Sequence, residues 1–209
     1  MNQQTRSILI GTLLGDGCLE TQNRGRTYRL KIEHSIKQKD YTDWLYQHFK
    51  SWVNGIPQKK TKVVKGKTYT NYWFQTRSTG DFRFFGQIFY LENRKIVPKI
   101  IHKLLTPLAL AVWFMDDGSM KSKQHKALIL NTQCFSNKDL KLLIAALDKK
   151  FGVEAKIRPQ KSGNQLIIPQ PEQFIQLIKP YLRPEFYYKL GANHINTMPK
   201  EYRRRSKVG

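Results

Sequence analysis

The sequence is poor in cysteine, in acidic residues and in long apolar stretches. Cys18 and Cys134 are the only cysteines, so neither a disulfide framework nor a cysteine-based zinc site is expected, and a reducing compartment is the natural setting. No stretch approaches the ~20 apolar residues of a membrane-spanning helix, and no long basic amphipathic helix stands out, so no membrane partner is predicted. The N-terminal segment lacks the features of a targeting signal and is expected to be part of the fold; a protein of this kind that works in an organelle would be made there.

The scarcity of acidic residues leaves a large positive charge. The 209 residues include 37 Lys and Arg against 15 Asp and Glu, a formal net charge of +22. Such a charge repels itself in a compact body and calls for a polyanionic partner. Nucleic acid fits best, because Lys and Arg contacts to phosphate release counterions and supply most of the affinity. Hydrophobic residues make up 40% of the chain and aromatic residues 12%, which excludes a disordered basic tail.

One arrangement occurs twice in the chain. An apolar stretch ends in Asp-Gly, an extended segment follows, and a helix begins shortly afterwards. These copies run over 7–17, 26–35 and 37–53 in the first half and over 107–118, 126–135 and 136–152 in the second. Because the copies lie about one hundred residues apart, the repeat predicts two similar small domains, 1–105 and 106–209, in a chain of mixed α+β class.

Period-two alternation of apolar and polar residues predicts half-buried antiparallel strands over 28–35, 69–77 and 153–158. Helices are predicted near 38–53, 79–91, 107–117, 137–151 and 171–181. Thr79 and Ser136 are the expected N-caps, and Pro171 suits a first helical turn. The segment Lys59–Lys67 predicts a basic hairpin with a Gly turn, and the basic tail Tyr202–Lys207 is either a phosphate contact or a solvated end.

The outer faces of these strands are basic and rich in amides. For a single strand, a generic hydrated face is an equal alternative. Several such faces in a chain of this charge favour a sheet whose side chains reach into the major groove of DNA. The predicted DNA-binding residues are Arg29, Lys31, Lys59, Lys60, Lys62, Lys65, Asn71, Trp73, Gln75, Arg77, Gln133, Lys156, Arg158 and Lys161.

Two aspartates, Asp16 and Asp117, end the two apolar stretches. Both stretches are apolar almost all round, so both helices are expected to be buried. Small residues such as Gly11 would allow them to approach closely and bring the two carboxylates near a common axis. Gly17 and Gly118 are expected to adopt the left-handed conformation that ends many helices.

Paired carboxylates at helix C-termini are unfavourable by themselves, because they face the negative end of the helix dipole and repel each other. Divalent cations reverse both effects, and Mg²⁺ takes carboxylate, carbonyl and water oxygens. The predicted metal ligands are therefore Asp16 and Asp117 with the carbonyl oxygens of Gly15 and Asp116, with Mn²⁺ as a substitute for Mg²⁺. Ions there would activate water and stabilise the leaving oxygen of a phosphodiester. A single Asp-Gly is most often only a turn after a helix; two at matching places in a repeat favour a site.

The segments Leu9–Gly17 and Leu110–Gly118 resemble the two signature helices of the LAGLIDADG homing endonucleases. The likeness extends over nearly the whole chain, including Lys95-Ile-Val-Pro98 and Leu130-Asn-Thr-Gln133. It implies two pseudo-symmetric αββαββα-like halves with saddle-shaped antiparallel sheets, packed through two central helices. It also implies a monomer that clamps a long site in double-stranded DNA and cuts both strands across the minor groove, leaving short 3′ overhangs.

The resemblance further implies roles for single residues. Lys95 and Lys189 match basic residues that polarise the attacked phosphate or its water network, and Glu33 and Asn131 match strand residues that touch this network. Taken without the resemblance, both lysines would be ordinary surface residues and Glu33 a salt-bridge partner. The predicted catalytic residues are Asp16, Asp117, Lys95, Lys189, Glu33 and Asn131. Val112 in the second motif replaces a smaller residue of the family pattern, as does the adjacent Trp113, which leaves the local helix spacing open.

Two other functions fit parts of the sequence. A group I intron RNA maturase would use the same positive charge on RNA, and a non-catalytic regulator would bind DNA alone. The paired acids argue against a purely splicing role, because RNA binding needs no such pair, although cutting and splicing could coexist. No histidine-metal nuclease is predicted, since the histidines lack metal-ligand spacing and are expected to be scattered surface or core residues: His34, His48, His102, His125 and His194. An organelle (mitochondrion or chloroplast) that encodes the protein and a bacterial cytoplasm both fit as its location.

Overall fold

The computed structural model describes residues 1–122 and 124–191, so the basic tail and His194 lie outside the described residues. The first half runs α1 (Gln3–Leu14), β1 (Cys18–Glu20), β2 (Arg29–Ser35), α2 (Lys39–Phe49), β3 (Gln58–Val64), β4 (Lys67–Gln75) and α3 (Arg83–Phe89). The second half runs α5 (Pro107–Asp117), β7 (Gly118–Ser122), β8 (His125–Leu130), α6 (Asn137–Phe151), β9 (Lys156–Arg158), β10 (Gln165–Ile168) and α7 (Glu172–Ile178). Between the halves lie β5 (Tyr90–Leu91), β6 (Arg94–Lys95) and α4 (Ile101–Leu104).

Short 3₁₀ helices extend several of these elements. They are η1 (Ile36–Gln38), η2 (Lys50–Trp52), η3 (Gly80–Phe82), η4 (Lys179–Tyr181) and η5 (Pro184–Leu190). Within the described ranges, every helix is too short or too polar to span a bilayer.

Each half contributes one four-stranded antiparallel sheet, and the two sheets have the same strand order. The order is β1-β2-β4-β3 in the first and β7-β8-β10-β9 in the second. The alternation predicted along β2 and β4 is present: Leu30, Ile32 and Phe74 are buried on the inner face. This architecture confirms the α+β class and the αββαββα order that the motifs implied.

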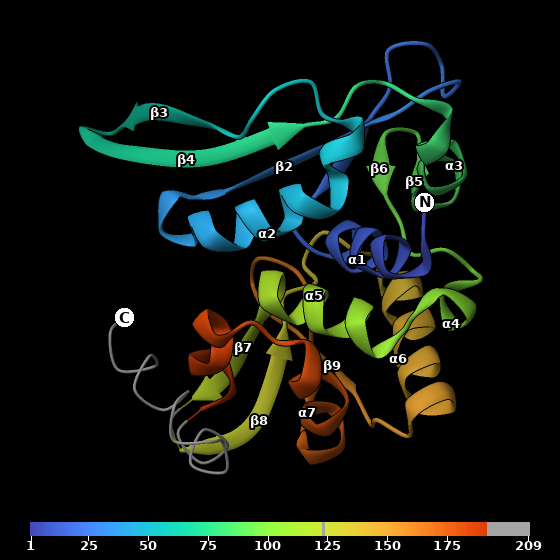
Figure 1. Cartoon of the computed structure of the whole chain (residues 1–209). Helices are drawn as coiled ribbons and strands as arrows, with labels where there is room; N and C mark the ends of the chain where they lie inside the picture. Colours follow the sequence, from blue (N-terminus) through green and yellow to red (C-terminus); the bar gives the residue numbers. More distant parts are fainter. Residues whose placement is uncertain (123, 192–209) are drawn as a thin grey trace.

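The helices α1 and α5 lie side by side at the centre of the molecule, between the two sheets (Figure 1). Their close approach depends on Gly11, where an added Cβ would lie 2.4 Å from the carbonyl oxygen of Ala109 and 2.6 Å from Cβ of Val112. The larger Val112 therefore fits because α1 has no side chain opposite it. Trp113 is fully buried, and one continuous apolar core joins both halves.

The glycines after the two motifs do not adopt the predicted left-handed conformation. Gly118 has φ −76° and ψ 148°, and Gly17 is not among the residues with positive φ. Their role is steric, since a Cβ would lie 2.2 Å from Cγ2 of Thr12 at Gly17 and 2.2 Å from Cδ2 of Phe114 at Gly118. The chain leaves α5 in an extended direction at Gly118, and at both glycines there is room for a hydrogen atom only.

The predicted ends of the other elements hold in part. The hydroxyl of Thr79 accepts from the N–H of Asp81, and Ser136 forms a capping box with Asp139. Pro171 is the N-cap of α7 and does not lie in its first turn. The helix predicted near 79–91 ends at residue 89 because Tyr90 and Leu91 pair with β6, and only 156–158 of the segment 153–158 form a strand.

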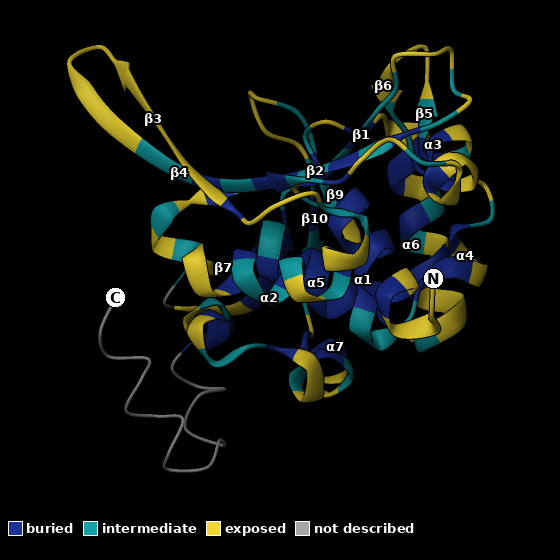
Figure 2. Cartoon of the chain, turned by 45° about the horizontal axis from the view of Figure 1, so that its top comes forward, coloured by how far each residue is buried: buried dark blue, intermediate teal, exposed yellow. Residues whose placement is uncertain are grey.

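The predicted basic hairpin is formed by β3 and β4. Its turn is Lys65-Gly66, and both residues have positive φ, at 49° and 74°, as expected for the turn that joins two tightly paired strands. The hairpin projects from the body of the molecule, and its outer part is exposed (Figure 2). The exposed outer part of the hairpin is accessible for contact with a long, extended partner.

Candidate functional site

The packing of α1 against α5 brings the two motif acids to one end of the helix pair. Asp16 lies in the turn that follows α1, and Asp117 is the last residue of α5. Burial, followed by the charges of Asp16 and Asp116, raises the pKa of Asp117 to about 8. Burial and the charge of Asp116 also raise the pKa of Asp16. The charge of Asp16 therefore acts on Asp117 from the end of the neighbouring helix.

A third acid, Asp116, lies within the helix interface. Its side chain is 0% exposed, and a Cβ added at Gly15 would lie 2.4 Å from its Oδ2. Its carboxylate accepts hydrogen bonds from the Asp16 N–H (3.2 Å) and from the Tyr41 hydroxyl (2.7 Å). The sequence predicted a role only for the carbonyl of Asp116, so this cross-helix position of its carboxylate was missed.

Two lysines hold corresponding positions at the two helix ends. Lys95 Nζ donates to the carbonyl oxygens of Gly15 (2.7 Å) and Gly17 (2.8 Å). Lys189 Nζ donates to those of Met115 (2.5 Å) and Asp116 (3.0 Å). Burial lowers the pKa of both lysines. Neither is the ordinary surface residue that its local sequence suggests.

These lysines bind the same carbonyl oxygens, those of Gly15 and Asp116, that were predicted as metal ligands. A carbonyl oxygen has two lone pairs, so it can accept from a lysine and still face a cation. The negative charges of Asp116, Asp117 and Asp16 oppose the effect of burial on Lys189. Each helix end therefore carries one lysine as well as at least one carboxylate.

The two predicted strand residues, Asn131 and Glu33, differ in their position relative to the helix ends. Asn131 follows β8 and meets the site directly, since its N–H donates to the carbonyl oxygen of Asp117 (3.0 Å) and its Oδ1 accepts from Gln165 (2.7 Å). Glu33 points to the outer face of the first sheet, where it accepts from Asn71 (2.6 Å). That hydrogen bond lowers the pKa of Glu33.

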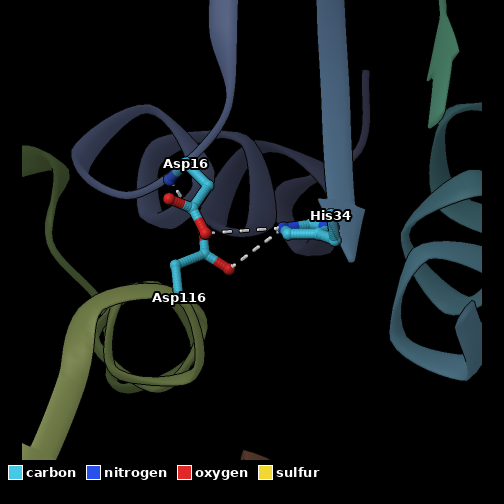
Figure 3. A group of neighbouring side chains, drawn as sticks. All are labelled: Asp16, His34 and Asp116. Atoms are coloured by element: carbon cyan, nitrogen blue, oxygen red, sulfur yellow. Dashed lines mark hydrogen bonds and ion pairs between the residues drawn. The ribbon is translucent and has the colours of Figure 1, made fainter. Parts of the chain in front are cut away.

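His34 is a neighbour of the acids that the sequence analysis did not assign to the site. Its side chain points inward from β2, and Nε2 lies 3.8 Å from Oδ2 of Asp16 and 3.8 Å from Oδ1 of Asp116 (Figure 3). The prediction that the histidines are scattered surface or core residues holds for His34 only in that it is buried. The sequence did contain a sign of this position. In the strand that follows the first motif, His34 continues the alternation of Leu30 and Ile32 and therefore points inward.

The outer face of the first sheet carries half of the predicted DNA-binding side chains. The register places Lys31 opposite Gln75 and Glu33 opposite Trp73, with Asn71 opposite Lys60. A hollow of about 150 Å³ on this face is lined by Glu20, Arg29, Lys31, Glu33, Lys60, Trp73 and Gln75. Trp73, half-buried, lines this hollow and not the core.

Not every predicted DNA-binding residue lies on that face. Lys59 pairs with Tyr72, whose side chain is buried, so Lys59 points to the opposite face of the sheet from Lys60 and Lys62. Arg77 follows β4 and donates to the carbonyl oxygen of Ser51 (2.7 Å).

The remaining predicted DNA-binding residues are distributed over the turn of the hairpin and the second half. Lys65 lies in the hairpin turn, and Lys156 on β9 pairs with Glu154 (2.9 Å). Arg158 on β9 donates to Gln165 (3.3 Å). Gln133 and Lys161 lie in loops beside the second sheet.

Comparison with known proteins places this arrangement in a family. The probable intron-encoded endonuclease 1 of Wickerhamomyces canadensis is 32% identical over 193 residues, covering 88% of this chain and 83% of that protein. The cytochrome b mRNA maturase bI2 of Saccharomyces cerevisiae is 31% identical over 206 residues, but this chain spans only about half (48%) of its length.

A solved structure shares nearly the whole fold. The homing endonuclease I-WcaI bound to its DNA recognition sequence superposes with a TM-score of 0.85 at 29% identity, covering 90% of this chain and 86% of that one. The profile of the LAGLIDADG DNA endonuclease family matches residues 6–175. The match includes both motifs, their two acids and both sheets. The chain belongs to the LAGLIDADG DNA endonuclease family.

Proposed function

We propose that this chain is a site-specific homing endonuclease that hydrolyses both strands of a long double-stranded DNA site with Mg²⁺, with Mn²⁺ as a substitute. The observation that carries the proposal is the pair of acids at the ends of α1 and α5, whose pKa values are both raised. Two like charges in this position have no structural benefit, and a divalent cation would convert their repulsion into attraction.

The residues present fit such a cation. Asp16 and Asp117 offer carboxylate oxygens and Gly15 and Asp116 offer carbonyl oxygens, the hard ligands that Mg²⁺ prefers. When bound, Mg²⁺ would supply an activated water and stabilisation of the leaving oxygen. Lys95 and Lys189 keep positive charge at the two helix ends, which suits the two phosphates that must be attacked in one duplex.

Other residues take supporting roles in the proposal. Asn131 fixes the end of α5 through its N–H bond to the Asp117 carbonyl. Glu33 and Asn71 are hydrogen-bonded to each other on the outer face of the first sheet, where they would order the surface that meets the DNA. The duplex would lie along the outer faces of both sheets, with Lys60, Lys62 and the hairpin turn on the backbone or in the groove. In this arrangement 1–105 and 106–209 act as two half-site readers of one monomer.

The experiment is cleavage of a plasmid library that carries genomic fragments, read by sequencing of the cut ends. We expect cutting with Mg²⁺, binding without cutting with Ca²⁺, and loss of cutting in Asp117→Asn. The matched control is Asp148→Asn, which removes one exposed carboxylate from α6 and should cut normally. Specific binding without strand scission under Mg²⁺ or Mn²⁺ would replace the nuclease by a DNA-binding regulator.

A second function, assistance of group I intron RNA splicing, is favoured by the likeness to the Saccharomyces cerevisiae maturase. The net charge of +22 serves RNA as well as DNA. A splicing assay with the host intron tests it, and splicing that persists in Asp117→Asn would separate the two activities. Relatives with intron-encoded names also support an organelle that encodes the protein as its location, with a bacterial cytoplasm as the alternative.

A further inference from the structure

His34 presents a buried nitrogen to two acids, and none of the roles described above uses that nitrogen. The side chain is 2% exposed, and among the described residues Nε2 has no hydrogen-bond partner. The ligand atoms of Asp16, His34 and Asp116 all lie within 4.8 Å of one another. A buried imidazole nitrogen is normally hydrogen-bonded or ligated, so this one calls for an explanation.

The hydrogen bonds around His34 define which ring nitrogen carries the proton. The hydroxyl of Thr42 donates to the carbonyl oxygen of Gln38 (3.2 Å), so its oxygen accepts from Nδ1 of His34 (3.0 Å). In the neutral ring the lone pair is then on Nε2 and faces the two carboxylates (Figure 3). Acceptors that face acceptors repel each other unless a cation lies between them.

Both carboxylates face the same imidazole nitrogen. Asp116 is fixed by its hydrogen bonds from Tyr41 and from the Asp16 N–H. Ligand atoms at about 2.1 Å from one ion lie roughly 3 to 4 Å apart, and Nε2 lies 3.8 Å from Oδ2 of Asp16 and 3.8 Å from Oδ1 of Asp116. The side chain of Asp16 is 48% exposed, so an ion and its remaining water ligands can enter from solvent.

We propose that Asp16, His34 and Asp116 bind a divalent transition-metal ion of the Zn²⁺ class. The imidazole ligand distinguishes this site from the all-oxygen Mg²⁺ site, because imidazole favours Zn²⁺ and its neighbours in the first transition row, whereas Mg²⁺ prefers oxygen. The Nδ1–H bond to Thr42 is the arrangement that orients a metal-binding histidine. Because Asp16 belongs to both sites, Zn²⁺ would compete with Mg²⁺, a consequence that rests on the proposed function.

The test uses Zn²⁺ and the full chain without DNA. In protein labelled with ¹⁵N-histidine, Zn²⁺ should move the Nε2 resonance of His34 and leave its Nδ1 protonated. This measurement needs no variant. An unmoved Nε2 resonance at saturating Zn²⁺, or an Nε2 that stays protonated, would overturn the proposal.

Calorimetric titration with Zn²⁺ gives the second readout. His34→Asn keeps a donor toward Thr42 and removes the ligand, so Zn²⁺ affinity should fall at least tenfold, whereas the exposed His102→Asn should stay within twofold. Circular dichroism checks that each variant is folded, and Asp116→Asn replaces His34→Asn if the latter unfolds. Equal affinity in wild type and the folded variant would refute the site.

The two proposals fail separately. Cutting with Mg²⁺ together with an unmoved Nε2 resonance would overturn the zinc site alone. Zinc ligation by Nε2 in a chain that never cuts DNA would overturn the nuclease function and leave the zinc site intact.

Discussion

Replacing Asp117 with asparagine should stabilise the metal-free protein, and the gain should grow with pH. In the folded chain the pKa of Asp117 is about 8, against an ordinary value of 3.8. The folded state therefore holds the proton more tightly than the unfolded state. The contribution of Asp117 to the free energy of unfolding is fully present below about pH 4. It is lost as pH rises toward about 8, because the unfolded chain releases the proton at a lower pH than the folded chain. Asparagine has no proton to release, so the variant lacks this loss.

The size of the effect follows from the two pKa values. A tenfold change in proton affinity corresponds to about 1.4 kcal/mol, so full linkage between the two values gives about 5 to 6 kcal/mol. Because Asp117 is partly exposed to water, we expect about half of this, or about 2 to 3 kcal/mol near pH 8. For a chain of this length, that is a rise of about 5 to 10 °C in Tm.

The assay is urea and thermal unfolding in EDTA at several pH values between 4.5 and 8.5, for wild type, Asp117→Asn and the control Asp148→Asn. The difference between Asp117→Asn and wild type should widen with pH, and the control should show no such trend. Adding Mg²⁺ at the upper end should stabilise wild type more than Asp117→Asn. A difference that is constant with pH, or that narrows, would refute the account of Asp117 as a largely buried acid that its acidic neighbours repel.

Three further outcomes are expected. Gly11→Ala should lower the free energy of unfolding by about 1 to 3 kcal/mol, because its Cβ would lie 2.4 Å from the Ala109 carbonyl oxygen. In urea unfolding the control Gly80→Ala, where a Cβ meets nothing within 4 Å, should change it by less than about 0.5 kcal/mol. Lys189→Met should slow strand cutting by about 100-fold in single-turnover assays while DNA affinity in Ca²⁺ is kept, and loss of affinity instead would make it a DNA-binding residue. DNA affinity should fall steeply with salt, and Lys60→Ala should reduce the slope of log K against log salt by about 1; a flat salt profile would contradict the role of the outer sheet faces.

Much of the fold follows from local patterns. The alternation along 28–35 places Leu30 and Ile32 inside because strand side chains alternate between faces, whatever the sheet packs against. The caps Thr79 and Ser136 act within their own turns. The end of a strand depends on its partner, so the shortening of 153–158 to 156–158 could not be derived from alternation.

The predicted chemistry of the site also follows from local sequence patterns. Apolar helices that end in Asp-Gly, repeated once, are enough to indicate the family, and they led to the prediction of Asp16 and Asp117 as metal ligands, because paired carboxylates at helix C-termini are unfavourable without a cation. The register of the basic strands was accessible in part: alternation separates Lys59 from Lys60 and Lys62, but the prediction grouped all three.

By itself the sequence determined the family and the order of helices and strands, and it predicted a nucleic-acid partner and the two motif acids, because each depends on residue type, charge or spacing along the chain. Only the tertiary structure decided that Asp116 lies against Gly15, that Lys95 and Lys189 bind the carbonyl oxygens of the helix ends, and that His34 faces the acids. Each of these contacts joins segments about 20 to 100 residues apart. Their geometry is defined by how closely α1 and α5 approach, and therefore by packing across both halves.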